Sequence, residues 1–213
     1  MGRFFREPAS GFSHLAGALL SVAALVSLLC VAISNRDVWQ IVSFSIFGAS
    51  MILLYSASAT YHLVNASEKV VRILQKIDHS MIFVLIAGTY TPICLTLLRG
   101  RLGYWLLALI WSCAAAGIVM KMFFFDIPRL LYTGIYLIMG WIAVFVIVPL
   151  YRAGGPLPLV WLLAGGLMYT AGGIIYAIKK PDIFPGLLGF HEIFHIFVIL
   201  GSAAHYVMIL RFC

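Results

Sequence analysis

The chain has 213 residues, of which 63% are hydrophobic and only 10% are charged. A water-soluble domain carries about 25% charged residues, so this composition excludes a globule with a fully water-facing surface. The net charge of +7 comes from basic residues that lie singly or in pairs between apolar runs. Basic residues in such places set membrane topology and contact anionic headgroups, so we do not expect nucleic-acid binding.

Seven apolar stretches are each about long enough to cross a bilayer as a helix, which takes roughly 20 residues. In chain order they cover residues 13–34, 38–65, 78–98, 102–120, 129–150, 157–178 and 190–210. The first follows a basic N-terminus, as a signal peptide would, but it is longer than a signal core and we expect it to be retained. The connections are short. The sequence therefore predicts an all-α membrane protein, a single seven-helix transmembrane domain over residues 1–213.

Lys and Arg are unevenly divided between the two sides of this bundle. Nine of them fall on the side of the N-terminus and five on the other side. The positive-inside rule then places the N-terminus in the cytoplasm, and the odd number of spans places the C-terminus outside. The compact form is typical of a multi-pass protein of the bacterial inner membrane, that is, of the plasma membrane.

Polar side chains gather at the predicted ends of the second, third and seventh spans. They are Ser58, His62, Asp78, His79, His191 and His195. Residues four apart share one face of a helix, as His191 and His195 do. Because successive spans alternate in direction, these ends meet at the cytoplasmic side, about 8–15 Å from the midplane at a rise of 1.5 Å per residue. Ionisable groups at such depth are costly and indicate a functional site.

Three imidazoles with an open position for water are the ligands of a catalytic zinc site. We predict that His62, His191 and His195 bind zinc, which lowers the pKa of a bound water toward 7. Asp78 would then hydrogen-bond that water or orient a ligand histidine. Ser58 would hold the water or a substrate oxygen.

The remaining histidines have plainer interpretations. We expect His14 and His79 to be neighbours of lipid headgroups, and His205, farther along the last span, to bond to a neighbouring helix. The pairs Gly165-Gly166 and Gly172-Gly173 are typical of close helix packing, since small residues let helices approach each other.

At these positions the chain resembles the hemolysin III family, within the wider progestin and adipoQ receptor group and its alkaline ceramidase relatives. The matching elements are Ser58-x-x-x-His62, Asp78 and His191-x-x-x-His195, with Ala87-Gly-Thr-Tyr-Thr-Pro92 and Gly166-Leu-Met-Tyr-Thr-Ala-Gly172. The resemblance implies a seven-helix bundle with its N-terminus inside and zinc held by the three histidines. It also implies that Asp78 and Ser58 lie just outside the ligand set.

The resemblance leaves the activity open, since members are described as receptors, lipid amide hydrolases, cytolytic proteins and membrane-homeostasis factors. Our leading hypothesis is zinc-dependent hydrolysis of a lipid amide or ester bond, with a membrane lipid or lipid-like molecule as substrate. The alternative is a non-enzymatic, receptor-like or homeostasis protein with structural zinc, whose fourth ligand is His79 or Asp78.

Two further hypotheses are weaker. The run from His191 to His195 also fits H-E-x-x-H, in which Glu192 would be the general base of an intramembrane protease. Such proteases take a further acidic ligand from a later helix, and no later helix follows here. A cytolytic pore would need a charged stripe along a helix, which the sequence lacks.

Overall fold

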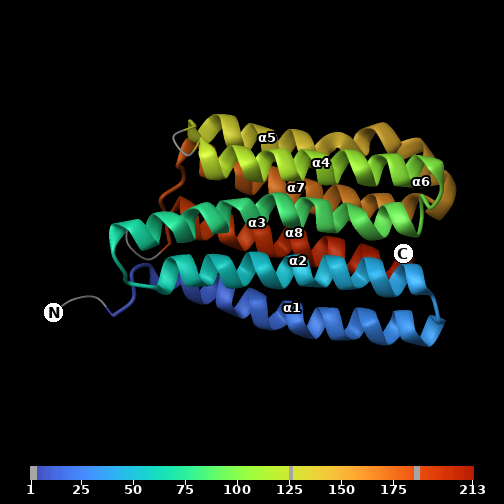
Figure 1. Cartoon of the computed structure of the whole chain (residues 1–213), viewed down its shortest axis with the longest axis horizontal. Helices are drawn as coiled ribbons and strands as arrows, with labels where there is room; N and C mark the ends of the chain where they lie inside the picture. Colours follow the sequence, from blue (N-terminus) through green and yellow to red (C-terminus); the bar gives the residue numbers. More distant parts are fainter. Residues whose placement is uncertain (1–3, 125–126, 185–187) are drawn as a thin grey trace.

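The computed structural model describes residues 4–124, 127–184 and 188–213, and these residues form helices and no strand. The helices are α1 (Pro8–Asn35), α2 (Val38–Leu63), α3 (Glu68–Leu95), α4 (Arg101–Phe123), α5 (Arg129–Trp141), the 3-10 helix η1 (Ile142–Val146), α6 (Ile147–Gly154), α7 (Pro156–Ile178) and α8 (Phe190–Phe212). They run roughly parallel or antiparallel to one another, and the chain enters α1 at one end of the bundle and leaves α8 at the other (Figure 1). The all-α class is confirmed. Residues 1–3, 125–126 and 185–187 of the predicted domain lie outside the described residues.

The bundle shows an apolar exterior. Among the described residues, six helical units are long and apolar enough to cross a membrane. Five of them are the single helices α1, α2, α4, α7 and α8. The sixth is the continuous run of α5, η1 and α6. Large apolar side chains on the outside of the bundle are widely exposed, with Phe145 at 85% and Leu130 at 71%. Such a surface suits hydrocarbon, where no polar side chains are needed on the outer face.

Helix α3 differs most from its predicted bounds. We expected it to begin at residue 78, whereas it begins at Glu68 and carries Lys69, Arg72 and Lys76 in its first turns. That boundary was wrong because a search for uncharged runs stops where charges begin, although a helix can continue beyond the hydrocarbon into a polar layer. As a result, Asp78 lies inside α3 and not at its start.

The predicted fifth span is one helical unit with a defect in its middle. Pro149 lies in α6 and has no N–H to give to the carbonyl four residues earlier, so the regular ladder fails just upstream, where η1 occurs. The hydroxyl of Tyr90 in α3 inserts at this point. It accepts a hydrogen bond from the Ala143 N–H (2.7 Å) and donates to the Gly140 carbonyl (2.6 Å). Tyr90 thereby satisfies backbone groups that the defect frees.

Helices α7 and α8 pack closely through the glycines singled out in the sequence. A Cβ on Gly165 would clash with the ring of His205, and one on Gly172 would lie 2.8 Å from Cβ of Phe197. The predicted packing role is confirmed for these two glycines. A Cβ on Gly166 would meet no atom within 4 Å, so that position tolerates a side chain.

Candidate metal centre

Three histidines from two helices converge at the end of the bundle where α1 begins. The ligand atoms of His62, His191 and His195 all lie within 4.8 Å of one another. Nε2 of His62 is 3.2 Å from Nε2 of His191. His62 and His195 are 1% and 2% exposed, so the cluster is sheltered from solvent. The structure brings the three predicted ligands together in a group that could hold a metal ion.

Local structure explains why these side chains meet. His62 lies in the last turn of α2, on the buried face that also carries Tyr55 and Ser58. Helix α8 begins directly after Gly189, whose N–H donates to the Glu192 carboxylate (3.0 Å). That cap fixes the first turn of α8, and with it the position of His191. His195 follows one turn later, on the same face.

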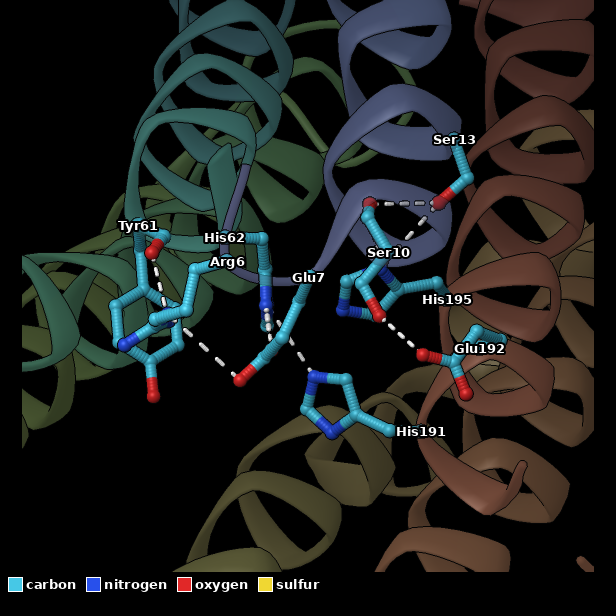
Figure 2. Close-up of polar contacts among 9 residues, drawn as sticks. All are labelled: Arg6, Glu7, Ser10, Ser13, Tyr61, His62, His191, Glu192 and His195. Atoms are coloured by element: carbon cyan, nitrogen blue, oxygen red, sulfur yellow. Dashed lines mark hydrogen bonds and ion pairs between the residues drawn. The ribbon is translucent and has the colours of Figure 1, made fainter. Parts of the chain in front are cut away.

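The outer nitrogens of two of these rings are held by acceptors, as Figure 2 shows. Nδ1 of His62 is 2.5 Å from Oε2 of Glu7, and Nδ1 of His195 is 3.2 Å from the carbonyl oxygen of Ser10. A carbonyl or carboxylate oxygen can only accept, so a neutral imidazole here carries its proton on Nδ1. The lone pair of Nε2 is then free on each ring. This is the donor arrangement that a metal site requires.

Glu7, the first acidic residue of the chain, belongs to this arrangement, although no sequence pattern pointed to it. Glu7 occupies the N-cap position of α1, and its hydrogen bond to His62 holds the pKa of the Glu7 carboxyl below its usual value. An isolated Glu beside a basic N-terminus carries no motif, and nothing in the sequence shows that residues 6–13 fold against the ends of α2 and α8. A signal was nevertheless available, because acidic residues number only seven in the chain.

Asp78 and Ser58 lie beside the histidines but outside the triad. Both residues are buried, Ser58 in α2 and Asp78 in α3. Both line a cavity that also receives His191 and His195. Among the described residues, the group of metal-capable atoms within 4.8 Å contains neither Asp78 nor His79.

The other histidines are buried and do not lie among headgroups. His14 is 3% exposed and stacks on His195, with ring centroids 3.6 Å apart. Neither ring nitrogen of His14 finds a hydrogen-bond partner among the described residues, and Nδ1 of His79 also lacks one. The headgroup interpretation of these two residues was wrong, because helices α1 and α3 turn them inward. His205 bonds to the carbonyl of Leu162 in α7 (3.2 Å), as predicted.

The cavity extends away from the triad along the axis of the bundle. It lies among α2, α3, α5, α7 and α8, and most of its lining is apolar. Residues on α8 from His195 to His205 line it, which corresponds to a length of about 15 Å at 1.5 Å per residue. That is about half of the hydrocarbon thickness, or one leaflet. A buried triad at the end of a long apolar cavity defines the class: a helical membrane protein with a candidate metal centre.

Comparison with known proteins narrows this class to a family. The family model described as Haemolysin-III related matches residues 3–206, and the chain belongs to this family. The chain is 44% identical over 207 residues to the Hemolysin-3 homolog of Bacillus subtilis, covering 97% of this chain and 94% of that protein. It is 40% identical to Hemolysin-3 of Bacillus cereus, covering 99% of this chain and 93% of the other. It is 27% identical to the human Monocyte to macrophage differentiation factor, covering 97% and 90%.

Proposed function

We propose that the protein is a zinc-dependent hydrolase of a lipid amide or ester bond in the bacterial inner membrane. In this proposal the chain crosses the membrane seven times, with the histidine triad near the cytoplasmic face. The observation that carries the proposal is the placement of the triad: its ligand atoms lie within 4.8 Å of one another, and His191 and His195 also line one end of an apolar cavity about as long as a leaflet.

The donor set supports zinc among the common metals. Neutral imidazole is a favoured ligand of zinc, and three protein ligands with one open position are typical of its catalytic sites. When bound, zinc polarises a carbonyl oxygen and lowers the pKa of a water. The chain's own residues then supply orientation and proton transfer.

Asp78 is the residue that we assign to proton transfer. Its carboxylate lines the cavity beside the triad and can accept a proton from the attacking water and return it to the leaving group. Ser58 lines the same cavity and would hold the carboxylate in one orientation. His14 is buried in the same wall, and its two ring nitrogens find no partner among the residues that the structure describes, so it offers a contact for a polar group of the substrate.

The cavity supports a lipid substrate. Its wall beyond the triad is built from side chains such as Ile86, Leu137 and Val198, which suit an acyl chain and exclude water. An acyl chain lying there places its carbonyl carbon at the triad. The scissile bond would then be the amide or ester that joins the chain to its headgroup.

The contacts of Glu192 do not favour proteolysis. In an H-E-x-x-H protease this Glu must reach the water at the metal. Here its two carboxylate oxygens accept hydrogen bonds from the Ser10 hydroxyl (2.6 Å) and the Gly189 N–H (3.0 Å). Glu192 therefore serves as a structural acceptor at the start of α8.

A structural zinc site in a non-enzymatic protein is the second candidate. The names of the relatives compared above describe no hydrolase, so they do not favour the enzyme over this candidate. Structural sites usually have four protein ligands. The group of metal-capable atoms in the described part of the chain has three, which leaves a position for water and favours the catalytic form.

The decisive measurement is turnover by purified protein of known zinc content. We expect release of free fatty acid from at least one member of a panel containing ceramides and acyl-ester lipids. Asp78→Asn should keep its zinc and lose roughly 100-fold or more in kcat, because general acid–base catalysis contributes 10²–10⁴-fold. Full zinc occupancy without turnover on any member of the panel would leave the structural site as the better proposal.

A further inference from the structure

We infer that residues 6–13, which precede and open α1, are a working part of the metal centre, with Glu7 as the positioning residue for His62. We call residues 6–13 the N-terminal strap. This inference rests on the proposed metal binding and extends it to a segment that holds no metal ligand itself. The strap contacts the outer sides of two of the three ligand rings (Figure 2).

Glu7 holds His62 by two contacts. Its side chain accepts a hydrogen bond from Nδ1 of His62 (2.5 Å), and its backbone N–H donates to the carbonyl of His62 (2.9 Å). The ring and the backbone of the ligand are therefore fixed by the same residue. A carboxylate on the outer nitrogen of a metal-binding histidine sets its tautomer and raises its basicity.

Arg6 holds Glu7 and the strap against the end of α2. Its guanidinium donates to the carbonyl of Tyr61 (2.6 Å) and lies over the Tyr61 ring, 4.2 Å from the centroid. Its Nε is 3.7 Å from Oε1 of Glu7. The second carboxylate oxygen of Glu7 thus has the Arg6 guanidinium as a neighbour, which favours the orientation in which the first oxygen faces His62.

Ser10 performs the corresponding task for His195. Its carbonyl accepts from Nδ1 of His195, and its hydroxyl donates to Oε1 of Glu192 (2.6 Å). Ser10 is fully buried between α1 and α8. Glu192 thereby ties the strap to the helix that carries two of the three ligands, which gives the Glu of the H-E-x-x-H run a role other than proteolysis.

The strap should therefore set zinc affinity. The test uses the full-length protein in detergent, with the zinc dissociation constant measured by competition against a chelator. Loss of such an outer partner typically weakens metal binding 10–100-fold. We expect Glu7→Ala to fall in this range and Glu7→Gln to weaken binding less, because an amide oxygen still accepts from Nδ1. The matched control is Glu68→Gln, an exposed acid in the first turn of α3, which should stay within about twofold.

A charge-conserving variant separates positioning from general electrostatics. Glu7→Asp keeps the negative charge but draws the carboxylate away from Nδ1 of His62, so it should weaken zinc binding nearly as much as Glu7→Ala if Glu7 acts through that contact. Wild-type affinity in Glu7→Asp together with a loss in Glu7→Ala would mean that Glu7 contributes only its charge, and would overturn the positioning role. Equal affinities for wild type, Glu7→Ala and Glu7→Gln would do the same.

The failure of this inference is distinguishable from the failure of the proposed function. A wild-type protein that binds no zinc contradicts the metal centre itself. A wild-type protein that binds zinc while Glu7→Ala binds it equally well contradicts only the strap. If Glu7→Ala does not fold, the zinc affinity of Glu7→Gln can still be compared with that of wild type.

Discussion

At the scale of single residues, the chemistry of the site depends on which nitrogen of each imidazole carries the proton. Glu7 and the Ser10 carbonyl occupy the outer nitrogens of His62 and His195, and both can only accept. The inner nitrogens are therefore unprotonated in the neutral rings. A cluster of buried histidines that meet without such partners would be a set of competing donors. Here the unprotonated Nε2 atoms of His62 and His195 leave both rings suited to bind a metal ion.

Removal of any one triad ring should abolish stable zinc binding. Alanine at His62, His191 or His195 leaves two protein ligands, fewer than zinc sites normally use. We expect zinc content by elemental analysis to fall from about one per chain to near zero. The control is His205→Ala, on the same helix as two ligands but bonded to the Leu162 carbonyl, which should keep its zinc. Full zinc content in the triad variants would refute the centre.

At the scale of helices, the bundle is stabilised by side-chain hydrogen bonds to backbone groups that an irregular helix leaves without their usual partners. The break between α5 and α6 is the main example, because hydrocarbon offers no hydrogen-bond partner to the backbone groups that a break in a membrane helix frees. Tyr90 reaches this break from α3. The contact also joins two of the helices that enclose the cavity.

Tyr90→Phe should therefore destabilise the protein although it removes a single oxygen atom. It leaves the part-buried N–H of Ala143 without its acceptor, at a cost of about 1–3 kcal/mol. We expect a thermal midpoint lower by several degrees in detergent, since about 1 kcal/mol shifts the midpoint by 2–4 °C in a domain of this size. Tyr104→Phe, at an exposed position of α4, is the matched control and should unfold like wild type. If Tyr90→Phe and Tyr104→Phe unfolded at the same midpoint, the hydrogen bonds from Tyr90 to the break would contribute no measurable stability.

At the scale of the whole molecule, the role of α3 decides the topology. In the described part of the chain, six helical units are long and apolar enough to cross a membrane, and α3 is not among them. It nevertheless lies within the bundle, with Phe83 and Ala87 fully buried. We propose that α3 crosses as the seventh span, shielded from lipid by its neighbours.

Reporter fusions test this proposal directly. Seven crossings place the two termini on opposite sides of the membrane, whereas six place them on the same side. We expect a periplasmic reporter such as alkaline phosphatase to be active after Cys213 and inactive when joined before the first helix. Activity at both ends or at neither would rule out seven crossings.

Much of the architecture was predictable because the membrane constrains it so strongly. Apolar length alone located most helices to within a few residues, as in α2, which begins at Val38 as expected. The alternation of spans also placed His62, His191 and His195 at one end of the bundle. The start of α3 was missed because charges mark the edge of the hydrocarbon and not the end of a helix.

The sequence by itself determined the class of protein, the helical bundle and the identity of the three histidines that meet. It could do so because hydrophobic length and the period of a helix are local properties of the chain. Only the tertiary structure decided that His14 faces inward, that a cavity lies beyond the triad, and that Glu7 and Ser10 bond to the rings of His62 and His195. These features depend on contacts between segments as far apart as residues 10 and 195, and no local pattern encodes such contacts.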